Sequence, residues 1–288
     1  MPFGRTANQK PSTDTSTKRT FDSPFLSLTG ERIVRIVGDE VQVKRHFWRG
    51  VNIGDGKTGE KPIVVARSEV DDSGETVFLG YDKAPDYWNN PIDEMYRSEY
   101  TKEEITTGGK YPQTRFYVNV FDRTPVFRTD DGIFYPEMYL TKDGDIKSEY
   151  VHLGEPIPHN KIMILEQSSG KPTGDHFYNK IIAAAKSLKS RQGKKITIEQ
   201  CDLRITYDLS SGRKWNGKPV PDRNVHPDIN QEHLAYKDED LYDLYSWLAP
   251  WPNVAIQDIL EGKVYADVVK EHNIKLFPVK NGSDDLPF

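Results

Sequence analysis

The chain has 288 residues, of which 36% are hydrophobic and 29% are charged, and its mean hydropathy is -0.70. A chain of this length forms one large domain or two small ones, and no apolar run reaches the about 20 residues that a membrane-spanning helix needs. The single cysteine, Cys201, excludes an internal disulfide and a zinc site built from several thiolates. The first residues contain no apolar core of a secretory signal. We therefore expect a cytoplasmic protein without a metal ion or another cofactor.

Charge is unevenly distributed along the chain, although the formal net charge is only -5. Residues 171–223 hold twelve Lys or Arg and five Asp or Glu, whereas residues 228–288 hold twelve Asp or Glu and five Lys. A basic middle can bind a polyanion while the whole chain stays acidic, and the acidic end can also fold over the basic surface. Ordinary solvated faces explain either block equally well. The acidic total therefore does not exclude a nucleic acid as the partner.

Residues 1–24 are rich in Thr, Ser, Lys and Pro and have little to bury, which predicts a disordered basic arm. Short runs of β-forming residues follow, separated by turns that contain Gly and Asp. The runs 31–37 and 41–48 flank Gly38-Asp39-Glu40, which predicts a hairpin. A third strand is expected at 62–67.

Two longer segments are predicted to be insertions between strands. Residues 82–112 mix Pro, Asn, Tyr and Gly with charges and are expected to hold one short helix, and residues 128–158 contain turn signals at 130–132 and 143–144. The clearest strand, 114–122, lies between the insertions, and a further strand is expected at 161–166.

The later part of the chain shows helical periodicity. Apolar residues recur every three to four positions from Phe177 to Leu188, which predicts an amphipathic helix, and one or two strands are expected within 195–209. Residues 227–277 are acidic and predicted to be helical, at 241–248 and 254–273, with a break near Gly262. Residues 278–288 have no periodicity and are expected to form a mobile acidic tail.

This order of elements predicts a mainly β protein with helices. Early strands, one helix between late strands and then more strands are typical of an OB-type five-stranded barrel with long insertions, here spanning residues 25–226. A β-sandwich explains the number of strands about as well. We also expect a helical C-terminal region and disordered termini.

Two of the predicted strands carry polar and aromatic residues in alternation with apolar ones. Because successive side chains point to opposite faces of a strand, the strand at 114–122 places Phe116, Val118 and Val120 in the core. Its other face then carries Arg115, Tyr117, Asn119, Phe121 and Arg123. In the strand at 41–48, the outward side chains are Lys44, His46 and Trp48.

Cations interleaved with aromatic rings suit single-stranded nucleic acid, because phosphates attract the cations and unpaired bases stack on the rings at about 1–3 kcal/mol each. The predicted stacking residues are Trp48, Tyr117, Phe121 and Trp215. The predicted phosphate-binding residues are Lys44, Arg45, Arg49, Arg115, Arg123, Arg204, Arg213 and Lys214. Aromatic rings that complete a core and cations that are merely solvated are the alternative interpretation.

An enzyme is the competing class of function. A metal-dependent nuclease needs several carboxylates that converge on Mg²⁺, and the chain offers Asp122, Glu137, Glu166, Glu199 and Asp202. These residues form no recognisable signature. The sequence also contains no phosphate-binding loop, dinucleotide-binding or nucleophile-elbow motif, so we predict neither catalysis nor a metal site.

The last residues of the chain are suited to binding another protein. A terminal aromatic ring can fill an apolar pocket while the carboxylates in front of it pair with a basic rim. The residues Asp284, Asp285, Leu286, Pro287 and Phe288 resemble the acidic tip of bacterial single-stranded DNA-binding proteins. The segments 119–124 and 162–168 resemble a pattern seen in phage single-stranded DNA-binding proteins.

The resemblance implies an OB-fold protein without enzymatic activity that coats single-stranded DNA in phage replication, recombination and repair. It also implies that the tip recruits replication and recombination proteins, and that the protein acts in the host cytoplasm. Residues 17–20 are similar to a basic element for self-association in some phage members, which leaves the oligomeric state open. A strand-annealing recombination factor with the same surfaces is a further alternative.

Overall fold

The computed structural model describes residues 23–82, 88–168, 180–181, 183–184, 200–208, 214–215, 218–219, 222–228, 234 and 236–276. The predicted N-terminal arm, apart from residues 23–24, and the predicted tail 278–288 lie outside the described residues. Most of the predicted helix at 177–188 does so too, although Lys180, Ile181, Ala183 and Ala184 are helical. No helix in the described ranges is long and apolar enough to cross a membrane.

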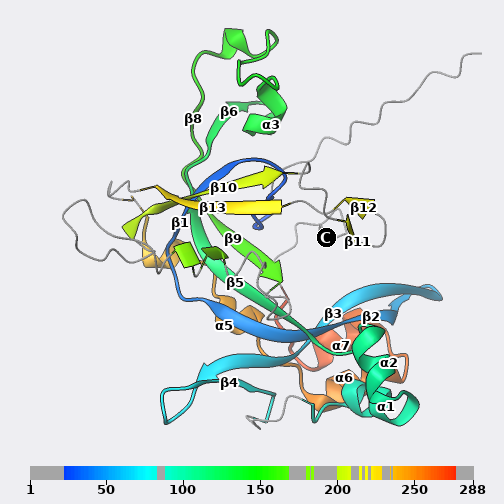
Figure 1. Cartoon of the computed structure of the whole chain (residues 1–288). Helices are drawn as coiled ribbons and strands as arrows, with labels where there is room; N and C mark the ends of the chain where they lie inside the picture. The colour runs from blue at the N-terminus through cyan, green and yellow to red at the C-terminus, as the bar shows by residue number, and fades with distance from the viewer. Residues whose placement is uncertain are drawn as a thin grey trace, which may run out of the picture.

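The protein is built on one antiparallel sheet of eight strands, in the order β13-β10-β1-β5-β2-β3-β4, with β9 also paired to β5 (Figure 1). The prediction of a mainly β fold with helices is confirmed. The described strands do not close into a barrel. The strands are β1 Arg32–Ile36, β2 Val41–Gly54, β3 Lys57–Val70, β4 Thr76–Leu79, β5 Gln113–Asp122, β9 Lys161–Ser168, β10 Asp202–Asp208 and β13 Asp222–Asp228.

Strand β5 organises the sheet because it has three partners. β9 pairs along one edge of β5 from Arg115 to Asp122, so β1 and β2 share the other edge. The hairpin predicted at Gly38-Asp39-Glu40 is therefore wrong. The N–H of Val37 bonds to the C=O of Asn119 at 3.1 Å, and a Cβ on Gly38 would lie 3.3 Å from the Asn119 side chain. This close approach keeps the chain running along β5 instead of turning back.

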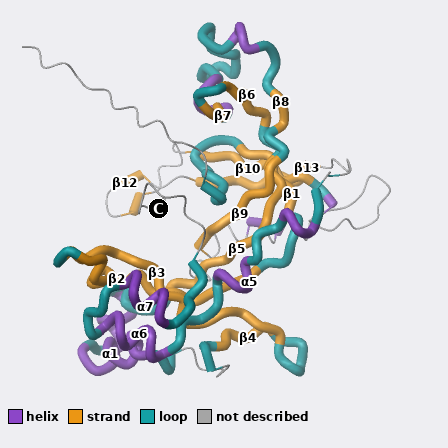
Figure 2. Tube along the Cα trace, turned by 180° about the vertical axis from the view of Figure 1, so that it is seen from behind, coloured by secondary structure: helices purple, strands orange, loops and turns teal. Residues whose placement is uncertain are grey.

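The sheet divides into two branches beyond β5, because β10 and β13 extend it from β1 while β3 and β4 extend it from β2. One hydrophobic core lies in the first branch and includes Val34, Phe116 and Leu203. A second core lies in the other branch and includes Val43 and Ile63. The two branches diverge in both views (Figures 1 and 2).

Helices cover the β2–β3 branch (Figure 2). The insertion at 82–112 forms two helices, α1 Pro91–Glu99 and α2 Lys102–Thr107, where one was predicted. The acidic segment forms α5 Leu244–Trp247, α6 Asn253–Leu260 and α7 Tyr265–Glu271, and the predicted break near Gly262, whose φ is 86°, is confirmed. Ala255, Ile256 and Ile259 of α6 are buried in the same core as Val43 and Ile63. The acidic segment is therefore part of the folded core.

The insertion at 128–158 forms a small lobe that stands away from the sheet, at the end opposite α1, α6 and α7 (Figures 1 and 2). Its own sheet has the order β7-β6-β8, and Phe127, Tyr139 and Tyr150 pack against one another. The elements are β6 Pro125–Thr129, β7 Gly132–Phe134, α3 Pro136–Tyr139, the 3-10 helix η1 Val151–Leu153 and β8 Ile157–Pro158. Elsewhere lie the paired β11 Lys214–Trp215 and β12 Lys218–Pro219, and the 3-10 helix η3 Asp238–Asp240.

Helix α6 provides a test of the shared core. Ile256→Ala should lower the free energy of unfolding by about 2–5 kcal/mol, because it leaves a cavity between α6 and the sheet. Val254, on the same helix, is 58% exposed, so Val254→Ala should change stability by less than about 0.5 kcal/mol. Urea unfolding measures both changes, and equal effects of the two substitutions would contradict the packing.

Candidate nucleic-acid interface

The face of β5 that was predicted to stack bases is inside the protein. Tyr117 is 0% exposed and Phe121 is 5% exposed. The acidic C-terminal segment covers this face: Phe121 packs against Tyr236, and the Asn119 side chain exchanges two hydrogen bonds of 3.0 Å with the backbone of Tyr242. The prediction that Tyr117 and Phe121 project outward is therefore wrong. Alternation correctly separated the two faces of β5, but a distant part of the chain covers the second one.

Strand β2 is covered on both of its faces near Arg45. The successive side chains of Arg45 and His46 are both buried, and the register shift between Lys44 and Arg45 does not cause this, because its extra residue, Val65, belongs to β3. His46 bonds to the buried Asp93 of α1 at 3.1 Å. Trp48, two residues after His46, is half-buried. Helix α1 therefore covers the face on which His46 was predicted to point outward, whereas Arg45 is buried on the same face as Val41 and Val43, as strand alternation requires.

Arg45 joins a buried polar cluster under β2. It donates hydrogen bonds to the Tyr117 hydroxyl and to Oε1 of Glu166, the latter at 2.5 Å, and Tyr117 donates to the same carboxylate oxygen at 3.0 Å. Arg115 lies 3.9 Å from that oxygen. Burial raises the pKa of the Tyr117 hydroxyl above its usual range, which keeps it a neutral donor. Two guanidinium groups thus share one carboxylate.

Arg115 is held close to this cluster at some electrostatic cost. Burial, together with the neighbouring charge of Arg45, lowers the pKa of Arg115. Phe47 offers partial compensation, because both guanidinium groups lie near its ring, Arg45 at 4.6 Å and Arg115 at 5.5 Å from the centroid. The cluster therefore carries an excess of positive charge beside an aromatic ring.

A pocket of about 370 Å³ adjoins this cluster, between β2 and the turn that joins α2 to β5. Aromatic rings and cations dominate its lining: Phe47, Trp48, Tyr96 and Tyr111 supply the rings, and Arg45, Arg49 and Lys110 supply the charges. Glu60 is the one acidic residue that lines it. The pocket therefore combines flat apolar surfaces with cations, the chemistry that the sequence predicted for β5.

The insertion at 82–112 builds the second wall of the pocket. Asn90 caps α1 by accepting a hydrogen bond from the Asp93 N–H, and Asp93 fixes the helix to β2 through His46. Tyr96 then lies with its ring centroid 6.1 Å from that of Trp48. Helix α1 therefore holds an aromatic ring opposite the one on β2.

Two glycines return the chain from α2 to the pocket. Gly109 has a φ of 66°, and a Cβ on Gly108 would lie 2.6 Å from the carbonyl oxygen of Glu104, so this turn favours glycine at both positions. The turn places Lys110 near the rings of Tyr96 and Tyr100. Sequence reasoning did not select Phe47, Tyr96, Lys110 or Tyr111. The Thr101–Glu104 capping box and the following Gly108-Gly109 were the available signals.

The remaining predicted cations are dispersed. Arg49 is exposed at the pocket and pairs with Glu60 at 3.3 Å, whereas burial lowers the pKa of Lys44. Arg123 pairs with Asp202 at 3.2 Å and Arg204 with Glu31 at 2.8 Å, both in the other branch of the sheet. The structure thus brings together Arg45, Trp48, Arg49 and Arg115.

The other predicted site residues cannot be placed by their side chains. Lys214 and Trp215 are described only as backbone in β11, and Arg213, Asp284, Asp285, Leu286, Pro287 and Phe288 lie outside the described residues.

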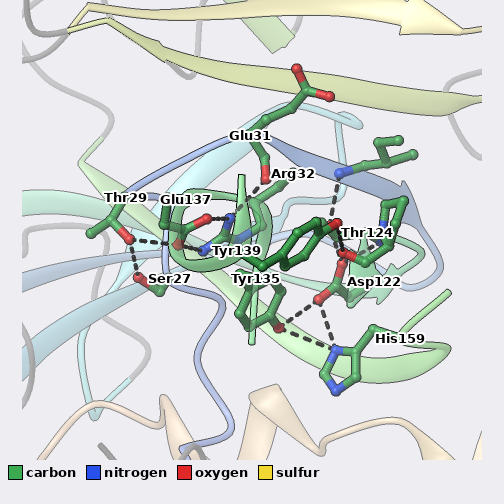
Figure 3. A network of polar contacts seen from close by, with 12 residues as sticks. Ser27, Thr29, Glu31, Arg32, Asp122, Thr124, Tyr135, Glu137, Tyr139 and His159 are labelled. Atoms are coloured by element: carbon green, nitrogen blue, oxygen red, sulfur yellow. Dashed lines mark hydrogen bonds and ion pairs between the residues drawn. The ribbon is translucent and has the colours of Figure 1, made fainter. Parts of the chain in front are cut away.

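The carboxylates considered for a nuclease already have other partners. Asp122 accepts hydrogen bonds from Thr124, Tyr135 and His159, at 2.6 to 2.9 Å, where the lobe joins β5 (Figure 3). Burial raises the pKa of Tyr135 above its usual range. This network ties the lobe to the sheet. The hydrogen bonds from Thr124, Tyr135 and His159 explain why a carboxylate is buried at this position.

The other acidic candidates are bound to separate arginines. Glu137 forms a bidentate ion pair with Arg32, with N–O distances of 2.7 and 2.9 Å (Figure 3). Glu166 pairs with Arg45, and Asp202 pairs with Arg35. Glu199 lies outside the described residues. In the described ranges one group, Asp258, Glu271 and His272, has the spacing of metal ligands, but Asp258 already pairs with Lys263 at 2.7 Å and His272 at 2.8 Å. The described carboxylates considered for the nuclease do not converge.

The comparisons find no family model, no curated protein and no solved structure that matches this chain. The chemistry of the pocket therefore carries the functional argument. A cavity walled by aromatic rings can stack a flat ring system, and the surrounding cations can pair with an anionic group attached to it.

Tyr117 provides a test of the corrected placement. Tyr117→Ala should lower the free energy of unfolding by about 3–5 kcal/mol, because a wholly buried ring is lost from the core. Tyr117→Phe should cost about 1–3 kcal/mol, since it leaves the buried Arg45 and Glu166 without one partner. Thermal or urea unfolding measures both. A Tyr117→Ala variant of unchanged stability would show that the ring lies at the surface.

Proposed function

We propose that this protein binds single-stranded DNA through the pocket between β2 and the α2–β5 turn, and that it is not an enzyme. The observation that carries the proposal is the pair of neighbouring rings, Trp48 and Tyr96, whose planes are tilted by 49°, within a pocket edged by Arg49 and Lys110. Unpaired bases stack on such rings, and the phosphates beside them pair with the cations. A duplex keeps its bases stacked inside, so this surface favours single strands.

The pocket replaces the face of β5 as the proposed interface. Tyr117 and Phe121 belong to the core. The positive charges of Arg45 and Arg115 lie in the buried cluster below the pocket, where they pair with Glu166. Trp48 and Arg49 keep both their predicted chemistry and their access to solvent. The bound DNA strand would continue from the pocket along the β2–β3 hairpin, where the side chains of Arg49 and Lys57 are exposed.

We also propose that the sheet is a modified OB-fold. An OB-fold is a partly open barrel, so an open sheet does not speak against the relationship. The arrangement of β1 and β2 as two parts of one strand beside β5 supports it, because this interrupted strand serves both branches of the sheet. The sheet would then present nucleic acid along β2.

The tip Asp284-Asp285-Leu286-Pro287-Phe288 is proposed to recruit replication and recombination proteins, as its resemblance to bacterial tips implies. A role in coating DNA during phage replication, recombination and repair in the host cytoplasm follows from the same resemblance. A strand-annealing factor is the second candidate, since it would use the same surface. The separate ion pairs of Glu137, Glu166 and Asp202 disfavour a nuclease.

The proposal is tested by titrating labelled oligonucleotides with the full chain in the presence of Mg²⁺. Single strands should bind more tightly than a duplex of the same sequence and remain intact. If four to six phosphates are neutralised, the logarithm of the affinity should fall against the logarithm of salt with a slope of roughly -3 to -4. Shortened DNA would identify a nuclease, and faster pairing of complementary strands would identify an annealing factor. Equal affinity for duplex would contradict the proposal.

Trp48→Ala should weaken binding of single-stranded DNA by about 1–3 kcal/mol, because one stacking ring is lost. Tyr245→Ala is the control, since Tyr245 is a ring more exposed than the half-buried Trp48, at 44%, but lies on α5 and does not line the pocket. Fluorescence anisotropy measures both affinities, with unfolding curves to verify the folds. Equal losses in the two variants would contradict the assigned interface.

Deletion of residues 283–288 should abolish recruitment of partner proteins while the affinity for DNA rises or stays the same. The physical reason is charge: the deleted segment carries two aspartates and competes with DNA for the basic pocket. Co-precipitation with candidate replication proteins and a DNA titration measure the two effects. A fall in DNA affinity on this deletion would contradict the division of roles.

A further inference from the structure

The pocket, its rim and the cluster below it together hold more positive charge than their carboxylates balance. Arg45, Arg49, Lys110 and Arg115 stand against Glu60 and Glu166, which leaves an excess of two positive charges. The Arg45 side chain is 4% exposed. Burying a charge without a counter-charge is costly. An anion that enters the pocket would neutralise part of this excess positive charge, which favours its binding.

The guanidinium groups also have unused hydrogen-bonding capacity. Nε of Arg45 and Nε of Arg115 are buried and find no hydrogen-bond partner among the described residues. Glu166 accepts from Arg45 and from Tyr117 through one and the same oxygen, Oε1. Buried polar groups are almost always hydrogen-bonded in proteins. The pair of arginines therefore offers an unfilled donor set for an oxyanion.

The number of charges distinguishes between kinds of phosphate. A phosphodiester inside a DNA strand carries one negative charge, whereas a terminal phosphate carries about -1.5 to -2 near neutral pH and has three strong acceptor oxygens. An excess of two positive charges matches the terminal group. Phe47, which lies beside both guanidinium groups, and the Trp48–Tyr96 pair supply the rings for the attached base.

We propose that this pocket binds the terminal nucleotide of a single strand that ends in a phosphate, with the phosphate at Arg45 and Arg115 and the base among Phe47, Trp48 and Tyr96. The inference rests on the proposed binding of single-stranded DNA and specifies which part of the strand the pocket takes. Both 5′ and 3′ phosphates have this chemistry, so the experiment separates them. The remainder of the strand leaves the pocket past Arg49 and Lys110.

The experiment compares one oligonucleotide of 20 thymidines in three forms, with a 5′ phosphate, with a 3′ phosphate and with two hydroxyl ends, by calorimetry with the full chain. One phosphorylated form should bind at least about tenfold more tightly than the hydroxyl form, equivalent to about 1.4 kcal/mol. The same end should matter for mononucleotides, so that thymidine 5′- or 3′-monophosphate binds and thymidine does not. Equal affinity of all three oligonucleotides would overturn the inference and leave the proposed function intact.

The outcomes separate the two proposals. If none of the oligonucleotides binds but a mononucleotide does, single-strand binding fails and the phosphate site stands. Arg115→Gln should remove the preference for the phosphorylated end while the hydroxyl form still binds. Should Arg115→Gln unfold the protein, Lys110→Gln at the rim serves instead and should reduce the preference at least threefold. Lys237→Gln, which removes an exposed positive charge away from the pocket, is the control and should keep the preference; its loss in this variant would contradict a local electrostatic origin.

Discussion

Burial of β5 on both faces is the constraint on which the rest of the structure depends. One face packs Phe116, Val118 and Val120 into the first core, and the other packs Tyr117 and Phe121 beneath the acidic C-terminal segment. Because β5 also pairs along both of its edges, its position is fixed by backbone and side chains alike. The strand therefore acts as the central support of the molecule.

This constraint moves the accessible chemistry to the rim of the sheet. With the β5 face covered, strand β2 and the turn after α2 are where aromatic rings and cations meet solvent. The His46–Asp93 bond, which fixes α1 against β2, sets the spacing between Trp48 and Tyr96. The pocket is consequently a product of the insertion and the sheet together, and either one alone would leave an incomplete wall.

Arginine has two distinct uses in this protein. Arg32 pairs with Glu137, and Arg35 and Arg123 share Asp202; these pairs join β1 and the end of β5 to the lobe and to β10. Arg45 and Arg115 also share one carboxylate, Glu166, but they lie next to a cavity. The first use stabilises a fold, whereas the second maintains a positive potential at a surface opening.

The sequence by itself determined the strands at 31–37, 114–122 and 161–166, the helical break at Gly262 and the separation of apolar from polar residues along β5, because these depend on local periodicity and on glycine. Trp48 and Arg49, which it selected as candidate binding residues, line the pocket. Only the tertiary structure decided that the polar side of β5 is buried, since the covering segment lies more than a hundred residues away. The burial of His46 under α1 and the packing of the insertion 82–112 beside Trp48 are likewise set by long-range contacts, which no local pattern encodes.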